Sequence, residues 1–163
     1  MKDKIRKSLF MTRLMTPDMA NFSGKVHGGT ILKLLDEAAY SCAARYSNAY
    51  VVTASLDQVM FKNPVRVGDL VTFKCNVNYV GRSSMEIGIR VDSENIRTKE
   101  KSHAISCYFT MIAVDDDGKS VEVPRLPLET EIEKKLFEAG KMRREMRKEI
   151  EARNRELHVG MEE

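Results

Sequence analysis

One long helical pattern, followed by several extended segments with no second helix between them, constrains the fold of this 163-residue chain more than any other feature. Residues 30–46 place apolar side chains at the i, i+3, i+4 spacing of a buried helix face, at Ile31, Leu34, Leu35, Ala38 and Cys42. Successive parallel strands need crossover connections, which are usually helices. The absence of such helices argues against a doubly wound parallel sheet.

Four segments after this helix alternate in polarity or are rich in Val, Thr and Tyr, which predicts strands over residues 50–61, 70–80, 85–91 and 103–114. Turn residues separate the segments, among them Asn63-Pro64 and Asp117-Gly118. A further short strand is expected over residues 8–15, before the turn at Pro17. The pattern predicts an α+β domain in which an antiparallel sheet wraps around one long central helix.

The distribution of charge divides the chain into a body and an extension. Lys and Arg number 27 against 24 Asp and Glu, and the net charge of +3 gives no general case for nucleic acid binding. Residues 129–156 hold nine Lys or Arg and eight Glu with few apolar residues between them. This predicts a solvated helix with i, i+4 ion pairs that can also pack on a neighbouring subunit. We expect a domain over residues 1–128 and a charged C-terminal helical extension over residues 129–163.

Cysteine usage and hydropathy predict the cellular location of the protein. Cys42, Cys75 and Cys107 form no CxxC pair, so neither a disulfide framework nor a zinc site is indicated, and we expect reduced, packed thiols. No apolar run reaches the length of a signal peptide or of a membrane-spanning helix. We therefore expect a cytoplasmic protein with no membrane insertion and no metal.

Asp36 is the first candidate for chemistry. At about 100° per residue it shares a stripe of the central helix with Leu32, Ala39 and Ala43, so it is a carboxylate on an otherwise apolar stripe. Such a stripe must meet something, most simply a second subunit, and a carboxylate there is costly unless it is paired or protonated. The position suits a general base or a structural Asp paired with a buried Arg or capping a loop, and helix geometry alone does not choose between them.

The loop before the helix is the second candidate. Gly28 and Gly29 at a helix start leave unpaired N–H groups that can hold an oxyanion or polarise a carbonyl, although paired glycines equally serve a tight turn. Asn21 adds an amide that can orient a water or donate to a carbonyl oxygen, or that simply belongs to the loop. His27 is expected to satisfy backbone groups at the helix entry.

A hairpin turn between two predicted strands is the third candidate. Gly81, Arg82, Ser83 and Ser84 combine a turn with a guanidinium, two hydroxyls and exposed N–H groups, which can also hold phosphate. Several basic residues near strand ends can add to such a site, and Arg125 is one of them. The sequence has no Walker loop, no GxGxxG, no Ser/His/Asp signature and no cluster of metal ligands.

The order of these residues resembles the hotdog-fold acyl-CoA thioesterases, a family that includes bacterial broad-specificity and vertebrate brain-type acyl-CoA hydrolases. Residues 21–39 resemble the family segment N-x-x-G-x-V-H-G-G…(L/M)-(D/E)-E-A. The resemblance continues in order through residues 52–57, Phe61, residues 64–69 and residues 81–87, and it covers about residues 8–127.

This resemblance implies hydrolysis of acyl-CoA to a free acid and coenzyme A, with no metal and no cofactor, since coenzyme A is part of substrate and product. It implies two units that share a continuous sheet, dimers that often assemble into a trimer of dimers, and an active site between subunits. Asp36 would act as general base or nucleophile, and Asn21 would reach in from the partner to position water or substrate. Gly28 and Gly29 would polarise the thioester carbonyl, and the turn at 81–84 would contact coenzyme A.

Two other functions remain as alternatives. A hotdog-fold hydratase or dehydratase generally relies on a catalytic histidine, and only His27 and His103 are available in the body, neither in the usual motif. A non-catalytic acyl-CoA-binding regulator would use the ligand to change its oligomeric state, but the presence of both Asn21 and Asp36 favours catalysis. Met60, Phe61 and Met85 are expected to belong to the core rather than to an acyl tunnel.

Overall fold

The computed structural model describes residues 6–157, so the outer ends of the two expected regions, at residues 1–5 and 158–163, lie outside the described residues. Two long helices and six strands make up this described part, together with one turn of 3₁₀ helix. In chain order they are β1 (Ser8–Leu14), η1 (Pro17–Met19), α1 (Gly28–Ser47), β2 (Tyr50–Leu56), β3 (Met60–Phe61), β4 (Asp69–Val80), β5 (Ser84–Asn95), β6 (Lys101–Val114) and α2 (Glu131–Leu157).

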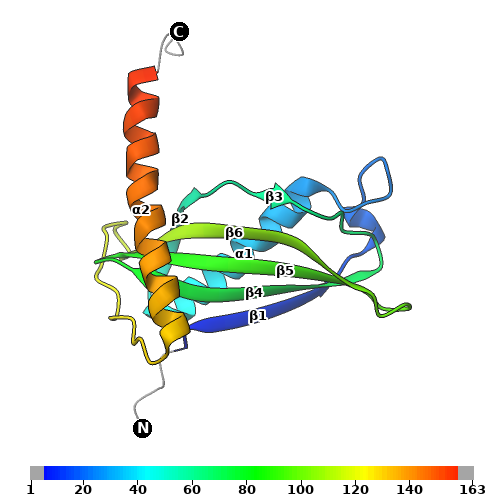
Figure 1. Ribbon diagram of the computed structural model, residues 1–163, viewed down its shortest axis with the longest axis horizontal. Coiled ribbons are helices and arrows are strands. Elements are labelled where there is room, and N and C mark those ends of the chain that lie inside the picture. Colours follow the sequence, from blue (N-terminus) through cyan, green and yellow to red (C-terminus); the bar gives the residue numbers. More distant parts are fainter. Residues whose placement is uncertain (1–5, 158–163) are drawn as a thin grey trace.

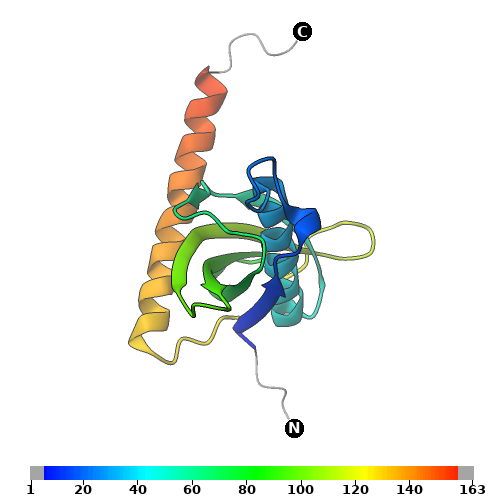
Figure 2. The same ribbon diagram turned by 90° about the vertical axis from the view of Figure 1, so that its right-hand side faces the viewer.

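All strands belong to one antiparallel sheet with the order β1-β4-β5-β6-β2, and β3 also pairs with β6. The sheet curls around α1, which lies along its concave inner face, while α2 lies against the outer face (Figures 1 and 2). The predicted α+β architecture is therefore confirmed. Two edges of the sheet remain unpaired within the described chain, β1 at one side and β2 at the other.

Helix α1 forms where the sequence predicts it, because its apolar face is buried against the strands. Its core-facing residues, the chief members of the buried cluster around the helix, are Ile31, Leu34, Leu35, Ala38, Ala39, Cys42, Ala43 and Tyr46. The helix begins two residues before the predicted start, at Gly28, because His27 has extended backbone angles and serves as its N-cap. It ends at Ser47, and the next residue, Asn48, has a φ of 53°, the left-handed conformation that commonly terminates helices.

The single strand predicted over residues 50–61 is wrong, because β2 and β3 are separate and five strands rather than four follow α1. Leu56 pairs with Phe109, whereas Met60 pairs with Ser106. Four residues of advance from β2 to β3 therefore lie opposite three residues of advance along β6, so the regular hydrogen-bond ladder is interrupted there. A second register shift between Thr53 and Ser55 puts a bulge inside β2 itself.

Helix α2 crosses the outer face of the sheet from β4 toward β2 (Figure 1). Phe137 packs on Tyr79 of β4 with ring centroids 4.9 Å apart. Further along the helix, Arg143 binds Glu86 of β5, with Nη2 2.7 Å from Oε1. One turn later, Arg147 binds Asp57, just past β2, with Nη1 2.9 Å from Oδ2. These contacts fix both the position and the direction of the helix.

The carboxylate of Glu86 lies at the centre of the contact between α2 and the sheet, and Glu86 is only 1% exposed. Arg143 donates to both of its carboxylate oxygens through Nε and also lies 3.7 Å above the ring of Tyr108. Burial acts to lower the pKa of Arg143, but its hydrogen bond with Glu86 and the negative charge there raise that pKa overall. A buried carboxylate needs such partners, because leaving it unpaired is strongly unfavourable.

The expectation of a solvated α2 is correct only for its C-terminal part. There the ion pairs Glu149–Arg153 and Glu151–Arg155 have the predicted i, i+4 spacing, at 2.7 and 3.1 Å. In the first half, however, Gly140 is buried against the sheet. Arg143 is the reason for the difference, because its charge docks the helix on the buried Glu86 instead of remaining in solvent.

The three cysteines are free and buried, as the sequence predicts. Burial raises the pKa of Cys42 and of Cys107 to about 12 and raises that of Cys75 further. Met85 belongs to the core as expected, but Met60 and Phe61 are exposed, so their assignment to the core is wrong. Among the helices of the described residues, none combines the length and the apolar character needed to cross a membrane.

These thiols should be inert in the folded protein, because the reactive thiolate is disfavoured and the sulfur atoms are covered. We expect Cys42, Cys75 and Cys107 to show no reaction with Ellman's reagent at neutral pH, and all three to react after denaturation. Rapid labelling of any of the three in the native protein would contradict the burial described above.

Gly140→Ala should lower stability, although alanine normally favours a helix by about 1 kcal/mol over glycine. A Cβ at this position would lie 2.7 Å from Cβ of Tyr79 and 3.1 Å from Oε1 of Glu86, so α2 would have to move away from the sheet. We expect a loss of about 1 to 3 kcal/mol in the free energy of unfolding, measured by urea titration. Glu138→Ala, at an exposed position of α2, serves as the control and should change little. A stability gain for Gly140→Ala would contradict this packing.

Candidate active site

Asp36 lies on the side of α1 that faces the free edge of the sheet. Its Oδ1 accepts a hydrogen bond of 2.6 Å from Oγ1 of Thr53 on β2. The expected stripe is divided, because Ala39 and Ala43 are buried whereas Leu32 and Asp36 are exposed in this single chain. The carboxylate is therefore held in place by a hydroxyl but is open to a substrate or to a second subunit.

Thr53 is a candidate site residue that the sequence did not single out as a functional group. It lies just before the register shift of β2, and the hydroxyl reaches toward α1. The only signal in the sequence was its place in the segment 52–57, which carries part of the family resemblance. The spacing of Thr53 and Asp36 in the sequence does not predict their contact, because that contact depends on the turn that joins α1 to β2.

The start of α1 offers backbone donors. As the first helical residue, Gly28 has an N–H with no acceptor inside the helix. The N–H of Gly29 points to Nδ1 of His27 at 3.4 Å, a long contact that a stronger acceptor can replace. His27 thus caps the helix, which confirms the structural role predicted for it.

Asn21 organises the loop that leads into α1. Its Oδ1 accepts from the backbone N–H groups of Ser23 and Lys25, at 2.9 and 3.1 Å, and from the hydroxyl of Ser23 at 2.8 Å. The oxygen is therefore used inside the loop, while the Nδ2 group can donate to a group outside it. This is the polarity needed to bind a carbonyl oxygen or a water lone pair.

The structure does not bring all predicted site residues together within one chain. Asp36 follows Gly28 by eight residues on the same straight helix, which puts their backbones about 12 Å apart along the axis. A single carbonyl group cannot contact hydrogen-bond donors and a base at that separation, since both contacts must be about 3 Å. One copy of the chain therefore presents the candidate backbone donors and the candidate base at different places.

The turn at 81–84 is a well-defined hairpin at the same end of the sheet as Thr53. The N–H of Gly81 donates to the carbonyl of Ser84 at 2.8 Å. Met85 pairs with Met111, which in turn pairs with Thr53, so the turn starts about 10 Å from Thr53, two strand spacings away.

The segment that carries Arg125 passes beside this turn. The N–H of Val123 donates to the carbonyl of Arg82 at 2.8 Å, and the N–H of Ala113 donates to that of Ser83 at 2.9 Å. Arg82 and Arg125 are both exposed. The structure thus brings two exposed guanidinium groups into the same neighbourhood as the serines of the turn.

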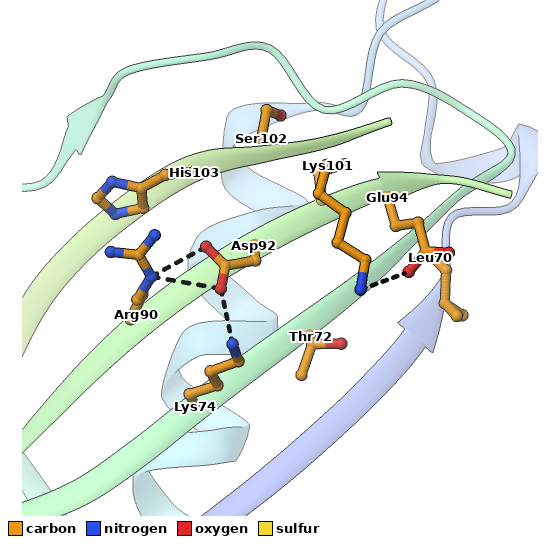
Figure 3. A pocket seen from close by; sticks show the side chains of 10 residues that line it. Leu70, Thr72, Lys74, Arg90, Asp92, Glu94, Lys101, Ser102 and His103 are labelled. Atoms are coloured by element: carbon orange, nitrogen blue, oxygen red, sulfur yellow. Dashed lines mark hydrogen bonds and ion pairs between the residues drawn. The ribbon is translucent and has the colours of Figure 1, made fainter. Parts of the chain in front are cut away.

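A separate pocket lies on the outer face of the sheet, far from Asp36, and Figure 3 shows its charged side chains. It has a volume of about 290 Å³. Asp92 binds Lys74 and Arg90 at 2.9 and 3.0 Å, and Glu94 binds Lys101 at 3.5 Å. Partial burial acts to raise the pKa of Asp92, but the hydrogen bonds and positive charges of Lys74 and Arg90 lower it overall. These charges satisfy one another, so the pocket is a paired charged surface rather than a catalytic site.

His103 borders this pocket, where its Nε2 lies 3.0 Å from the carbonyl of Ile105 and 2.8 Å from the hydroxyl of Ser106. Neither His103 nor the capping His27 contacts Asp36. Within residues 6–157, no group of three His, Cys, Asp or Glu side chains is arranged to hold a metal ion.

Exposed apolar side chains gather around the β2 edge. Tyr50 of β2 is 61% exposed and packs edge-on against Tyr40 of α1, with ring centroids 6.1 Å apart. Other large apolar groups exposed in the same region are Leu32, Val52, Leu56, Met60 and Phe61. Clusters of this kind mark surfaces that other molecules cover.

Comparison with known proteins connects this geometry to a family. The model of the thioesterase superfamily matches residues 23–100. Protein VdlD of Helicobacter pylori is 47% identical over 142 residues, covering 87% of this chain and 81% of VdlD. A hexameric acyl-CoA thioesterase has a solved apo structure that superposes with a TM-score of 0.85 and 40% identity, over 89% of this chain and 93% of that one.

An acyl-CoA hydrolase from Staphylococcus aureus, solved with butyryl coenzyme A and coenzyme A, is 31% identical, with a TM-score of 0.83 and 92% of each chain covered. Its alanine variants have been solved at an asparagine, an aspartate and a threonine that are 15 and 17 residues apart. Asn21, Asp36 and Thr53 have the same residue types at the same spacing. By sequence and by fold, this chain belongs to the thioesterase superfamily and has the hotdog fold.

Proposed function

We propose that this protein is an acyl-CoA thioester hydrolase that converts acyl-CoA to a free carboxylic acid and coenzyme A. The observation that carries the proposal is the exposed Asp36 carboxylate, oriented by Thr53 beside an uncovered apolar edge. The S. aureus acyl-CoA hydrolase supports it through the shared spacing of asparagine, aspartate and threonine.

The active site is shared between two copies of the chain that pair along β2. Asp36 and Thr53 come from one copy, and Asn21, Gly28 and Gly29 come from the other. This arrangement follows from the separation of about 12 Å between the two halves in one chain. The exposed apolar groups around β2 supply the contact surface, and the hexameric neighbour supports a homo-oligomer. In this proposal three dimers assemble into the oligomer.

Hydrolysis then needs few groups. The N–H groups of Gly28 and Gly29, with Nδ2 of Asn21, donate to the thioester oxygen and stabilise the negative charge that develops on it. Asp36 takes a proton from water as the water attacks the carbonyl carbon, or attacks directly and forms an anhydride that water opens. In both routes the C–S bond breaks, coenzyme A leaves as the thiolate and is protonated. No metal or cofactor is needed beyond the coenzyme A of the substrate.

The substrate's coenzyme A portion is assigned to the hairpin at Gly81, Arg82, Ser83 and Ser84, with Arg125 beside it. Two exposed guanidinium groups suit its phosphates, and the serine hydroxyls suit its polar pantetheine arm.

Hydration or dehydration of an acyl-CoA is less well supported. His27 caps α1 and His103 binds groups on the outer face, so neither stands beside Asp36 as a catalytic histidine would. A non-catalytic regulator would have no use for an oriented carboxylate. Free-thiol release from a panel of acyl-CoA esters tests both alternatives, and no hydrolysis at any chain length would overturn the proposed activity.

Asp36→Asn should reduce kcat/KM at least about 100-fold, because the amide can neither accept the proton nor attack the carbonyl. Affinity for coenzyme A, measured by calorimetry, should stay close to that of the unchanged protein, since the proposed coenzyme A contacts lie elsewhere. Glu37→Gln, which removes the neighbouring exposed carboxylate of α1, is the matched control and should keep full activity. Near-normal turnover by Asp36→Asn would overturn the mechanism.

Thr53→Val removes the hydroxyl that holds Asp36 but keeps the shape of the side chain. A hydrogen bond to a charged group contributes about 1.5 to 3 kcal/mol, so we expect kcat to fall about 10- to 100-fold with little change in KM. Thr53→Ser restores the donor and should recover most of the rate. Equal rates for the Val and Ser variants would show that the contact has no positioning role.

A further inference from the structure

The C-terminal part of α2 extends past the free edge of the sheet. From Phe137, over β4, to Arg147, which reaches Asp57 just past β2, the helix rises about 15 Å. Four neighbouring strands, β4, β5, β6 and β2, span about the same distance. Residues 148–157 therefore continue beyond β2 by about 15 Å more, at the rise of an α-helix. Figures 1 and 2 show the end of α2 projecting past the sheet. We call these ten residues the overhang.

The overhang carries apolar side chains on the face that α2 turns toward the sheet. Ile150 and Leu157 follow Arg143 at intervals of seven residues, so all three lie within about 40° around the helix. Arg143 is the residue that binds buried Glu86. Ile150 and Leu157 are 55% and 75% exposed, because no sheet of this chain lies beneath them. Their exposure results from the position of the sheet edge.

A groove occupies the corner between the overhang and this edge. It has a volume of about 1060 Å³ and is lined by residues 54–58 of the β2 end and by α2 side chains that include Met146, Ile150 and Asn154. Thr110, on its floor, has a buried hydroxyl with no hydrogen-bond partner among the described residues. Such an atom is normally satisfied by a group that enters the site.

We propose that the overhang is a clasp that lies on the outer face of a second copy of this chain. Pairing through β2, which rests on the proposed function, continues the sheet past its present edge and places the partner's strands beneath residues 148–157. Because a two-fold interface repeats each contact, each copy clasps the other. The length of the overhang matches about three further strands, so it covers the outer surface of the partner next to the shared edge.

Two other features favour a second copy over an unrelated partner. The overhang has both signs of charge, and they are already paired as Glu149–Arg153 and Glu151–Arg155, so no strongly charged ligand is indicated. The match to the hexameric thioesterase covers 89% of this chain, which is more than residues 1–128 provide, so that oligomer includes an equivalent of part of α2.

The test is the double variant Ile150→Glu and Leu157→Glu, which keeps good helix formers in the overhang but removes the apolar contact. Both substitutions remove a buried apolar contact in the proposed interface, and two-fold symmetry removes each contact twice. We therefore expect subunit exchange between labelled and unlabelled protein, followed by native mass spectrometry, to become at least tenfold faster. Sedimentation should show dissociation to monomers on dilution.

Ile132→Glu is the matched control, because Ile132 lies on the same helix face five turns earlier and is 70% exposed, at the end of α2 away from β2. It should leave exchange within about twofold. A chain that ends after Lys148 keeps the Arg143 and Arg147 contacts that dock α2. It should show the same faster exchange as the double variant, and agreement between the two would exclude misfolding of the double variant as the cause.

Unchanged exchange in both altered proteins would overturn the clasp, and so would separation of hexamers into stable dimers, since that would place the overhang between dimers. The outcome is independent of the chemistry, because Asp36→Asn removes hydrolysis without touching this surface. A monomeric wild-type protein that still hydrolyses acyl-CoA would instead overturn the shared site.

Discussion

The packing of α1 inside the curled sheet is the contact on which the other parts of the molecule depend. One helix has to fill the core with one face and present Asp36 with another, while its first turn supplies free N–H groups. Because the helix is straight and rigid, the distance between these groups is fixed by their spacing in the sequence. The proposed division of the site between two copies rests on that distance rather than on any flexible loop.

The outer face of the sheet depends on a second constraint, the buried carboxylate of Glu86. Its charged partners come from α2, and the same helix reaches Asp57 just past β2, where the chain leaves the ladder and turns toward β3. Through this ion pair, α2 on the outer face of the sheet contacts Asp57, four residues after Thr53, whose hydroxyl reaches α1 on the inner face. An extension that resembles a solvated appendage in composition thus contacts the segment that follows β2, the strand whose Thr53 orients the Asp36 carboxylate.

Local patterns predicted the elements well, and contacts between them poorly. The period of residues 30–46 located α1, and the alternation of residues 70–80 and 103–114 located β4 and β6, because those signals depend on burial of one face. The break between Leu56 and Met60 depends on register with β6, and the role of Thr53 depends on its distance from Asp36; neither is a local property. Arg143 misled the prediction for α2, since a charge that docks on a buried Glu resembles a solvated one.

The proposed division of the site has a further consequence for how such domains can change. In the proposed homodimer there are two identical sites, and each site uses only one half of the catalytic residues of each copy. If two such domains were joined in one chain, one domain could lose Asp36 and the other Asn21, and one complete site would remain. Freed positions could then change without loss of the reaction, so the geometry of α1 lets duplicated copies become specialised.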